Sequence, residues 1–236
     1  MIDLNNKVAY ITGGTKGIGF GVAKALLKHG MKVAISGRSQ ESVDEALKDF
    51  NDDSVLGIVS DVAKMEDEKK AVAKILNKWG QLDVVLANAG VGHFAAIDEM
   101  TDKDWHSMID TNLNGVFHTL KASVEALKES KGYYITLASL AGTNFFATGA
   151  GYNASKFGVV GFTQAAMLDL RKYDIKVSTI MPGSVATHFN NNEPDESDAW
   201  KIQPEDIGEL VLDLLKMNPR TLPSKIEVRP SRPDKK

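Results

Sequence analysis

Tyr152 and Lys156 lie four positions apart at the start of an amphipathic stretch. If that stretch is helical, both side chains project from one face. A phenol with its ordinary pKa of about 10 transfers protons slowly at neutral pH, but a nearby ammonium favours the phenolate and lowers that pKa. The pair could therefore exchange a proton with a reacting oxygen, as carbonyl reduction requires. The alternative is an exposed ring beside a solvated lysine.

Ser139 is a second candidate, because it directly follows the apolar run Gly132–Ala138, which is typical of a buried strand. Its hydroxyl could hydrogen-bond a substrate oxygen and hold it against the tyrosine. The hypothesis is then Tyr152 as general acid for reduction, Lys156 as its electrostatic tuner and Ser139 as orienter. A nicotinamide would supply the hydride.

The segment Lys7–Gly19, KVAYITGGTKGIG, predicts a site for such a cofactor. An apolar run breaks into a glycine-dense turn and continues as a helical pattern. A helix start presents unpaired N–H groups and partial positive charge to a phosphate, and glycines let the backbone come close. The alternative is a glycine-rich turn with no ligand. We predict that the cofactor contacts Gly13, Thr15, Lys16, Gly17, Ile18 and Gly19.

The end of the second predicted strand, Lys32–Ser36, indicates which nicotinamide dinucleotide binds. An acidic residue there would hydrogen-bond the 2′-hydroxyl of the adenosine ribose. The chain instead has Gly37-Arg38-Ser39, and Arg38 offers a planar cation suited to a phosphate. Lys16 is a second cation that could reach the same place. The pattern favours NADP(H), with contacts from Arg38 and Ser39.

Strands and helices alternate along the chain, which predicts an α/β fold with a doubly wound parallel (Rossmann) sheet of about seven strands and helices on both faces. We predict a single domain over 1–236 with a loose tail at 230–236, and a loop or lid at Ser184–Trp200. The other predicted strands are Val8–Ile11, Val55–Ser60, Leu82–Ala87, Gly132–Ala138, Ile175–Ile180 and Lys225–Val228. The predicted helices are Gly17–His29, Ser39–Phe50, Ala63–Trp79, Thr101–Ser130, Gly151–Tyr173 and Pro204–Lys216.

In such a sheet the ligand lies across the carboxyl ends of the strands. Those ends are scattered in the sequence but should converge on one crevice. They are Gly13–Gly19, Arg38, Asp61, Asn88–Gly90, Ser139 and Pro182–Thr187. Phe94, Phe145 and Phe146 also follow strand ends, where they would either line an apolar pocket or belong to the core.

Taken in order, these motifs resemble the short-chain dehydrogenase/reductase family over essentially the whole chain. They are TGGTKGIG at 12–19, Asp61-Val62, NAG at 88–90, Asn112, Ser139, YNASK at 152–156, and Pro182-Gly183 followed by Thr187. The resemblance implies a catalytic tetrad of Asn112, Ser139, Tyr152 and Lys156, in which the asparagine supports a water of the proton relay. It also implies cofactor contacts: Lys156 on the nicotinamide ribose, Asp61 at the adenine and Thr187 at the carboxamide. The remaining cofactor contacts predicted are Val62, Asn88, Ala89, Gly90, Tyr152, Pro182, Gly183 and Val185.

Composition excludes several other classes of protein. A net charge of −3 gives no electrostatic case for nucleic acid, and a chain without cysteine forms no disulfide or thiolate metal site. The histidines show no metal-ligand spacing. No signal peptide or membrane span is evident, so we expect a cytoplasmic protein without a metal or a membrane partner. The resemblance implies a homodimer or homotetramer packed through helices 101–130 and 151–173.

The leading hypothesis is an NADP(H)-dependent oxidoreductase that interconverts a carbonyl and a secondary alcohol. Among subgroups of the family, the chain looks most like 3-oxoacyl reductases, whose substrates are thioesters of acyl carrier protein or coenzyme A, and related carbonyl reductases. One alternative is a dehydrogenase of small ketones or 3-hydroxy acids. The other is a catalytically silent, NADPH-sensing regulatory protein, since a fold does not dictate function.

Overall fold

Seven parallel strands form one sheet in the order β3-β2-β1-β4-β5-β6-β7. The computed structural model describes residues 3–50 and 53–232. The strand order reverses between β1 and β4, which places a topological switch point beside the glycine turn. The strands are β1 Val8–Ile11, β2 Lys32–Gly37, β3 Val55–Val59, β4 Val84–Ala87, β5 Tyr133–Leu137, β6 Lys176–Pro182 and β7 Lys225–Val228. This architecture confirms the doubly wound sheet predicted from the alternating pattern.

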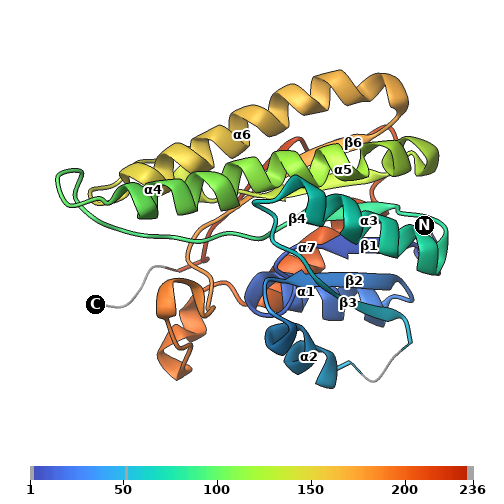
Figure 1. Cartoon of the computed structure of the whole chain (residues 1–236), viewed down its shortest axis with the longest axis horizontal. Helices are drawn as coiled ribbons and strands as arrows, with labels where there is room; N and C mark the ends of the chain where they lie inside the picture. Colours follow the sequence, from blue (N-terminus) through green and yellow to red (C-terminus); the bar gives the residue numbers. More distant parts are fainter. Residues whose placement is uncertain (1–2, 51–52, 233–236) are drawn as a thin grey trace.

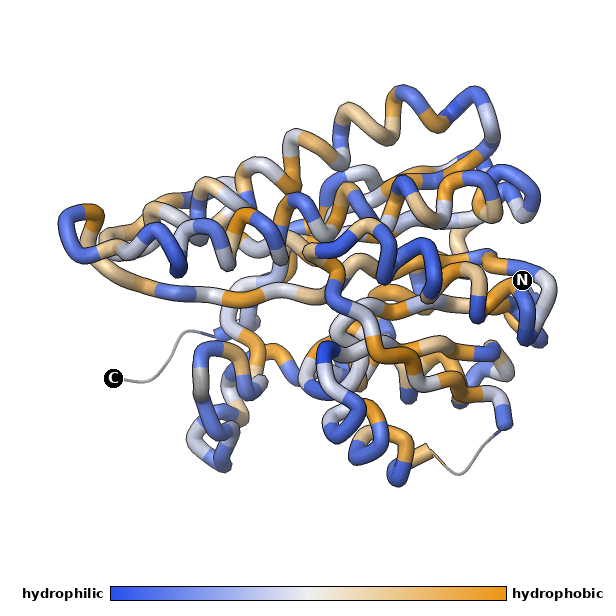
Figure 2. The backbone as a smooth tube through the Cα atoms, viewed as in Figure 1, coloured by the Kyte–Doolittle hydropathy of each residue, from blue (hydrophilic) through white to orange (hydrophobic). Residues whose placement is uncertain are grey.

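Helices cover both faces of the sheet (Figure 1). One apolar core packs α1 and α7 against the sheet, and a second packs α3, α5 and α6 against the opposite face. Hydrophobic residues concentrate along the strands, whereas hydrophilic residues gather in turns and alternate with hydrophobic ones along the helices (Figure 2). The helices are α1 Gly17–Lys28, α2 Gln40–Lys48, α3 Met65–Trp79, α4 Asp102–Met108, α5 Gly115–Ser130, α6 Ala150–Leu170 and α7 Pro204–Lys216. None of the helices described is long and apolar enough to cross a membrane.

The stretch predicted as one helix over 101–130 is interrupted. A π-helical turn, η1 Ile109–Asn114, separates α4 from α5, and the Gly115 N–H donates to the Asp110 carbonyl five residues back. A π turn holds one residue more than an α turn, and such turns are frequent at functional sites. Asn112 lies within it.

Short 3₁₀ helices also appear where the sequence predicted loops or longer helices. They are η2 Leu140–Gly142, η3 Arg171–Tyr173, η4 Phe189–Asn191 and η5 Glu196–Trp200. Two of them lie in the predicted loop 184–200, whose ends are held together by a parallel bridge between Val185 and Ile202. The predicted loose tail at 230–236 is only partly described, since residues 233–236 lie outside the described part of the chain.

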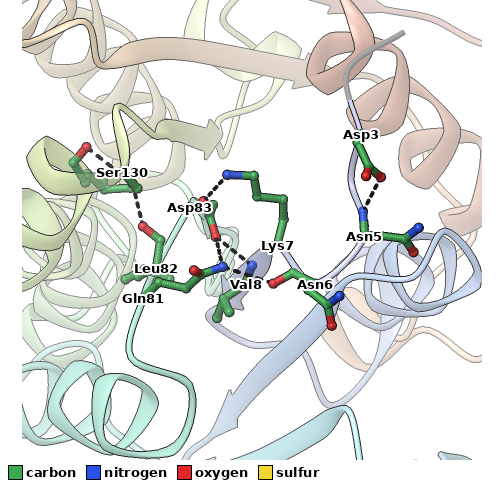
Figure 3. Close-up of polar contacts among 10 residues, drawn as sticks. Asp3, Asn5, Asn6, Lys7, Val8, Gln81, Leu82, Asp83 and Ser130 are labelled. Carbon is green, nitrogen blue, oxygen red and sulfur yellow. Dashed lines mark hydrogen bonds and ion pairs between the residues drawn. The ribbon is translucent and has the colours of Figure 1, made fainter.

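Asp83, whose side chain is 9% exposed, holds together the amino-terminal ends of two central strands, opposite the glycine turn (Figure 3). Its Oδ2 accepts from the Val8 N–H at 2.8 Å and from Gln81 Nε2 at 3.0 Å. Its Oδ1 accepts from Lys7 Nζ at 2.8 Å. A single carboxylate therefore fixes the start of β1 against the start of β4.

Candidate active site

A cavity of about 1100 Å³ extends along the carboxyl ends of the strands. Its wall includes the turns after β1, β2, β4, β5 and β6 and the first turns of α6, so the sequence-distant strand ends do converge. The predicted site residues on the wall are Gly13, Thr15, Lys16, Gly17, Ile18, Arg38, Ser39, Val62, Asn88, Ala89, Gly90, Ser139, Tyr152, Lys156, Pro182, Gly183, Val185 and Thr187. Three other predicted residues, Gly19, Asp61 and Asn112, are not on this wall.

The glycine turn has the geometry that a phosphate needs. Gly13 and Gly17 have φ angles of 61° and 57°, in the left-handed region that side chains disfavour. Helix α1 starts at Gly17, and no side chain caps its N-terminus or adds an acid to its first turn. The first N–H groups of α1 are therefore available to an anion beside the cavity. The turn fits the pyrophosphate of a dinucleotide.

A second turn, after β4, is fastened to the glycine turn. The backbone N–H groups of Asn88 and Ala89 both donate to Thr12 Oγ1, at 3.0 and 3.1 Å. Asn88 Nδ2 donates to the carbonyl oxygens of Thr12 and Gly13, at 2.8 and 2.9 Å. A Cβ on Gly19 would lie 2.6 Å from that Nδ2. Gly19 therefore permits the packing of these turns, and it is buried rather than on the cavity wall.

Tyr152 and Lys156 lie on the first turns of α6, opposite the end of β5. Lys156 is 4% exposed, and its Nζ donates to the Leu137 carbonyl at 2.9 Å and lies 5.7 Å from the centre of the Tyr152 ring. Burial lowers the pKa of Lys156 to about 8. The backbone of β5 thus holds the ammonium beside the phenol.

The phenol itself is less acidic than the sequence suggested. Burial raises the pKa of Tyr152 to about 12, and a hydrogen bond with Ser139 opposes this rise only in part. The expected lowering of this pKa by Lys156 is therefore not found, because desolvation of the phenolate outweighs the favourable contacts. At neutral pH Tyr152 is a protonated acid. Ser139 Oγ also accepts from the Ala141 N–H at 3.1 Å, which fixes the hydroxyl at the start of η2.

Asn112 is fully buried, and its amide clamps neighbouring backbone. Its Oδ1 accepts from the Val91 N–H at 2.8 Å, and its Nδ2 donates to the Val91 carbonyl and to Ser155 Oγ, both at 2.9 Å. Val91 and Thr111, the residue before Asn112, line the cavity. The asparagine side chain therefore does not line the cavity itself but holds the wall residue Val91 in place.

At the end of the cavity beside β2, Arg38 and Lys16 are both exposed on the wall. Neither forms an ion pair with an acid among the described residues. Asp61 is turned toward its own segment, since its carboxylate accepts from the Ala63 N–H at 3.2 Å and lies 3.6 Å from Lys64 Nζ. Its neighbours Ser60 and Val62 reach the cavity instead.

Sequence reasoning did not single out several residues of the wall. Thr111 and Val91 come from segments whose path depends on the π turn and on Asn112, and the sequence carried no signal for either. Phe189 belongs to the 184–200 segment, which was expected only as a loop or lid. The Phe189 ring lies 5.7 Å from that of Tyr152, so this segment covers the tyrosine.

The phenylalanines that followed strand ends are exposed rather than part of the core. Phe145 is 85% exposed and Phe146 48%. Phe94 packs its ring edge-on to Tyr152, with centroids 5.4 Å apart, and also contacts Phe146. Aromatic side chains therefore surround the tyrosine on its open side.

A doubly wound sheet with a dinucleotide-type glycine turn and a serine, tyrosine and lysine at its carboxyl edge defines a class of nicotinamide-dependent oxidoreductases. Residues 7–198 match the family described as short chain dehydrogenase, and the chain belongs to that family. An uncharacterized oxidoreductase of Staphylococcus haemolyticus is 32% identical over 231 residues, which are 98% of this chain and 100% of the relative.

Two solved structures share the fold closely. An alcohol dehydrogenase from the archaeon Thermococcus sibiricus, complexed with 5-hydroxy-NADP, has a TM-score of 0.90 and 30% identity over 98% of this chain and 100% of its own. A 3-ketoacyl-(acyl-carrier-protein) reductase from Brucella melitensis, complexed with NADH, has a TM-score of 0.89 and 26% identity, covering 97% and 99%. This protein is thus an oxidoreductase of a family in which both NADP-type and NADH complexes occur.

Proposed function

We propose that the protein is an NADP(H)-dependent oxidoreductase that interconverts a carbonyl and a secondary alcohol. The observation that carries this proposal is that Ser139, Tyr152 and Lys156 share one cavity with the uncapped start of α1. The bound cofactor would supply the hydride for reduction and accept it for oxidation. The residues of the chain would bind and orient the substrate and move the proton.

Tyr152 would donate its phenolic proton to the carbonyl oxygen during reduction. Its raised pKa keeps the phenol protonated at neutral pH. The Lys156 ammonium, held by the Leu137 carbonyl, would stabilise the negative charge that develops on the phenol as the proton leaves. Ser139 Oγ would orient the carbonyl oxygen toward the phenol. Oxidation of an alcohol would run the same steps in reverse.

Replacement of Tyr152 by Phe tests this assignment. The variant should lose at least about 100-fold in kcat for carbonyl reduction, the usual contribution of a positioned proton donor. It should still bind NADPH, since the ring that packs against Phe94 and Phe189 is kept. Turnover is measured from the absorbance of the reduced nicotinamide, and binding from its fluorescence. Unchanged turnover would exclude Tyr152 as the proton donor.

The preference for NADP(H) is supported by Arg38 and Lys16, two cations on one cavity wall that form no ion pair with any described acid, and by the absence of an acid in the sequence directly after β2. NADPH should bind about 10-fold or more tightly than NADH, a difference of about 1.4 kcal/mol. Arg38→Ala should remove most of this preference by weakening NADPH binding alone. Arg220→Ala, outside the cavity, is the control. Equal binding of the two cofactors by the unmodified protein would contradict the proposal.

A further inference from the structure

A second cavity, of about 650 Å³, meets the cofactor cavity at the proposed catalytic residues. Ser139 and Tyr152 line both, as do Gly183 and Ser184. A carbonyl group held between Ser139 and Tyr152 would therefore direct one of its substituents into the second cavity. The composition of this wall determines which substituents are accepted.

One side of the second cavity is apolar and aromatic. Leu140, Phe145, Phe146 and Trp200 line it. Phe145 is 85% exposed, so its ring is free to contact a ligand in this cavity. This side suits a hydrocarbon or aromatic group.

The segment after β7 adds cationic side chains to the wall. Arg229, Pro230, Ser231 and Arg232 follow β7 and line the cavity, and none of the described residues on its wall is acidic. Arg229 is paired with Glu227 at 3.0 Å, whereas Arg232 has no acidic partner among the described residues. Guanidinium groups bind carboxylates and phosphates in bidentate fashion.

The sheet fixes this cationic segment in place. Pro182 pairs with Val228 in the β6–β7 ladder, and the Gly183 N–H donates to the Val228 carbonyl at 2.8 Å. A Cβ on Gly183 would lie 3.1 Å from Leu140 Cδ1 and 3.3 Å from Pro230 Cδ. The absence of a side chain at Gly183 thus lets the segment after β7 pack close to η2, which begins next to Ser139. The predicted loose tail therefore starts as part of a cavity wall.

We propose that the second cavity selects carbonyl substrates that join an apolar or aromatic body to an anionic group, which Arg232 and Arg229 bind. This inference rests on the proposed oxidoreductase function and names its substrate class. The anionic group could belong to a free keto acid or to the phosphates of a coenzyme A thioester. Both sources present the same chemistry to the arginines, and the experiment below distinguishes them.

Turnover is compared within pairs that differ in charge. Benzoylpropionate and benzoylbutyrate are each tested beside the neutral methyl ester, and acetoacetyl-coenzyme A beside its neutral N-acetylcysteamine thioester, with NADPH and with NADH. The anionic member of at least one pair should have a kcat/KM about 10-fold higher, mainly through a lower KM, and this advantage should shrink with added salt. The pair that shows it identifies the source of the anion.

The arginines are then removed one at a time. Arg232→Gln should raise the KM of the anionic member about 10-fold and leave the neutral member unchanged, and Arg229→Gln should act in the same direction. Arg232→Lys should restore part of the effect. Arg220→Gln, which removes an arginine outside both cavities, should behave as the unmodified protein. A variant that weakens both members of a pair equally, or an unmodified protein that does not discriminate within any pair, would overturn the inference.

Binding is also measured without turnover. Trp200 lines the cavity, so phenylbutyrate should quench tryptophan fluorescence at lower concentration than phenylbutyramide does, and Arg232→Gln should abolish the difference. Trp200→Phe identifies the responding residue. If nicotinamide cofactors bind but no carbonyl is reduced, the proposed function fails. The titration then still shows whether the second cavity prefers an anionic ligand to a neutral one. If carbonyls are reduced and the titration shows no charge preference, the inference alone fails.

Discussion

Lys156 illustrates how a single buried residue carries both a cost and a function. Its ammonium is almost fully removed from water and is compensated by one carbonyl at 2.9 Å. Burial lowers its pKa to about 8 from an ordinary 10.5. Between those two values the unfolded chain binds the proton more readily than the folded protein does. The free energy of unfolding should therefore rise with pH in this window.

Replacement of Lys156 by Met should remove that pH dependence. The difference in unfolding free energy between the variant and the unmodified protein should change by about 2 kcal/mol between about pH 8 and about pH 10, with the unmodified protein gaining. Urea unfolding at several pH values measures it. Lys74→Met, at an exposed site on α3, should show no such change. A parallel pH profile in the Lys156 variant would mean that the lysine is not desolvated as described.

Residue types alone predicted which groups converge at the carboxyl edge, but not how each side chain is used. Tyr152, Lys156 and Ser139 meet because a strand end and a helix start must lie at that edge in any doubly wound sheet. The pKa of Tyr152 depends on burial, and burial depends on Phe94 and Phe189, which reach the ring from distant segments. Asp61 was likewise predicted at the cavity because it follows a strand end. Its carboxylate instead accepts a hydrogen bond from the Ala63 N–H, which turns the side chain toward its own segment. The catalytic and cofactor roles of these residues stay predictions.

At the scale of elements, short apolar runs bounded by turn residues were sufficient to predict the sheet, because strands buried on both faces are near-continuous hydrophobic segments. The helical region 101–130 was predicted without its π turn, since the Asn112 side chain within that turn exchanges hydrogen bonds with Val91 and donates to Ser155, both far away in the sequence. The bridge between Val185 and Ile202 is equally non-local. Such tertiary contacts leave no periodic signal.

Asp83 gives a prediction at this scale, because it joins two neighbouring strands. Asp83→Ala should lower the free energy of unfolding by about 2 kcal/mol, since it leaves the buried Val8 N–H without its acceptor and Lys7 without its partner. Chemical denaturation measures the loss. NADPH binding should be unchanged, because the cavity lies at the carboxyl ends of the strands and Asp83 at their amino ends. Glu125→Ala, which breaks an exposed pair with Lys128, should cost no more than about 0.5 kcal/mol. Equal losses in both variants would contradict the structural role of Asp83.

At the scale of the whole molecule, α5 and α6 lie on the same side of the sheet (Figure 1). Both helices leave large apolar side chains exposed. Phe117 on α5 is 46% exposed, and Phe157 and Leu168 on α6 are 43% and 60% exposed. On α6 the small residues Ala154, Gly161 and Ala165 are exposed as well and continue the same stripe. The apolar stripe along α6, with Phe117 of α5 beside it, suits a second copy of the same chain, and we propose a homo-oligomer packed through this face.

Charges placed on this stripe should separate the subunits. The unmodified protein should sediment as a dimer or tetramer, and the double variant Phe117→Glu with Leu168→Glu should sediment as smaller species while keeping its circular dichroism spectrum. Ile97→Glu is the control, because Ile97 is 75% exposed and lies outside both helices. Sedimentation of the unmodified protein as a monomer would exclude this assembly.

The π turn between α4 and α5 has one more consequence, which concerns helical phase. Each residue of an α-helix advances the direction of its side chain by about 100°. The extra residue in Ile109–Asn114 therefore shifts α5 out of phase with α4, although the two follow one another without a loop. Deletion of one residue in this turn would bring them into phase and rotate one helix relative to the other, so that either α4 would leave its contacts with α6 or α5 its contacts with α3. The number of residues between these two helices therefore cannot change by even one without loss of packing, although the sequence of this stretch looks like ordinary helix.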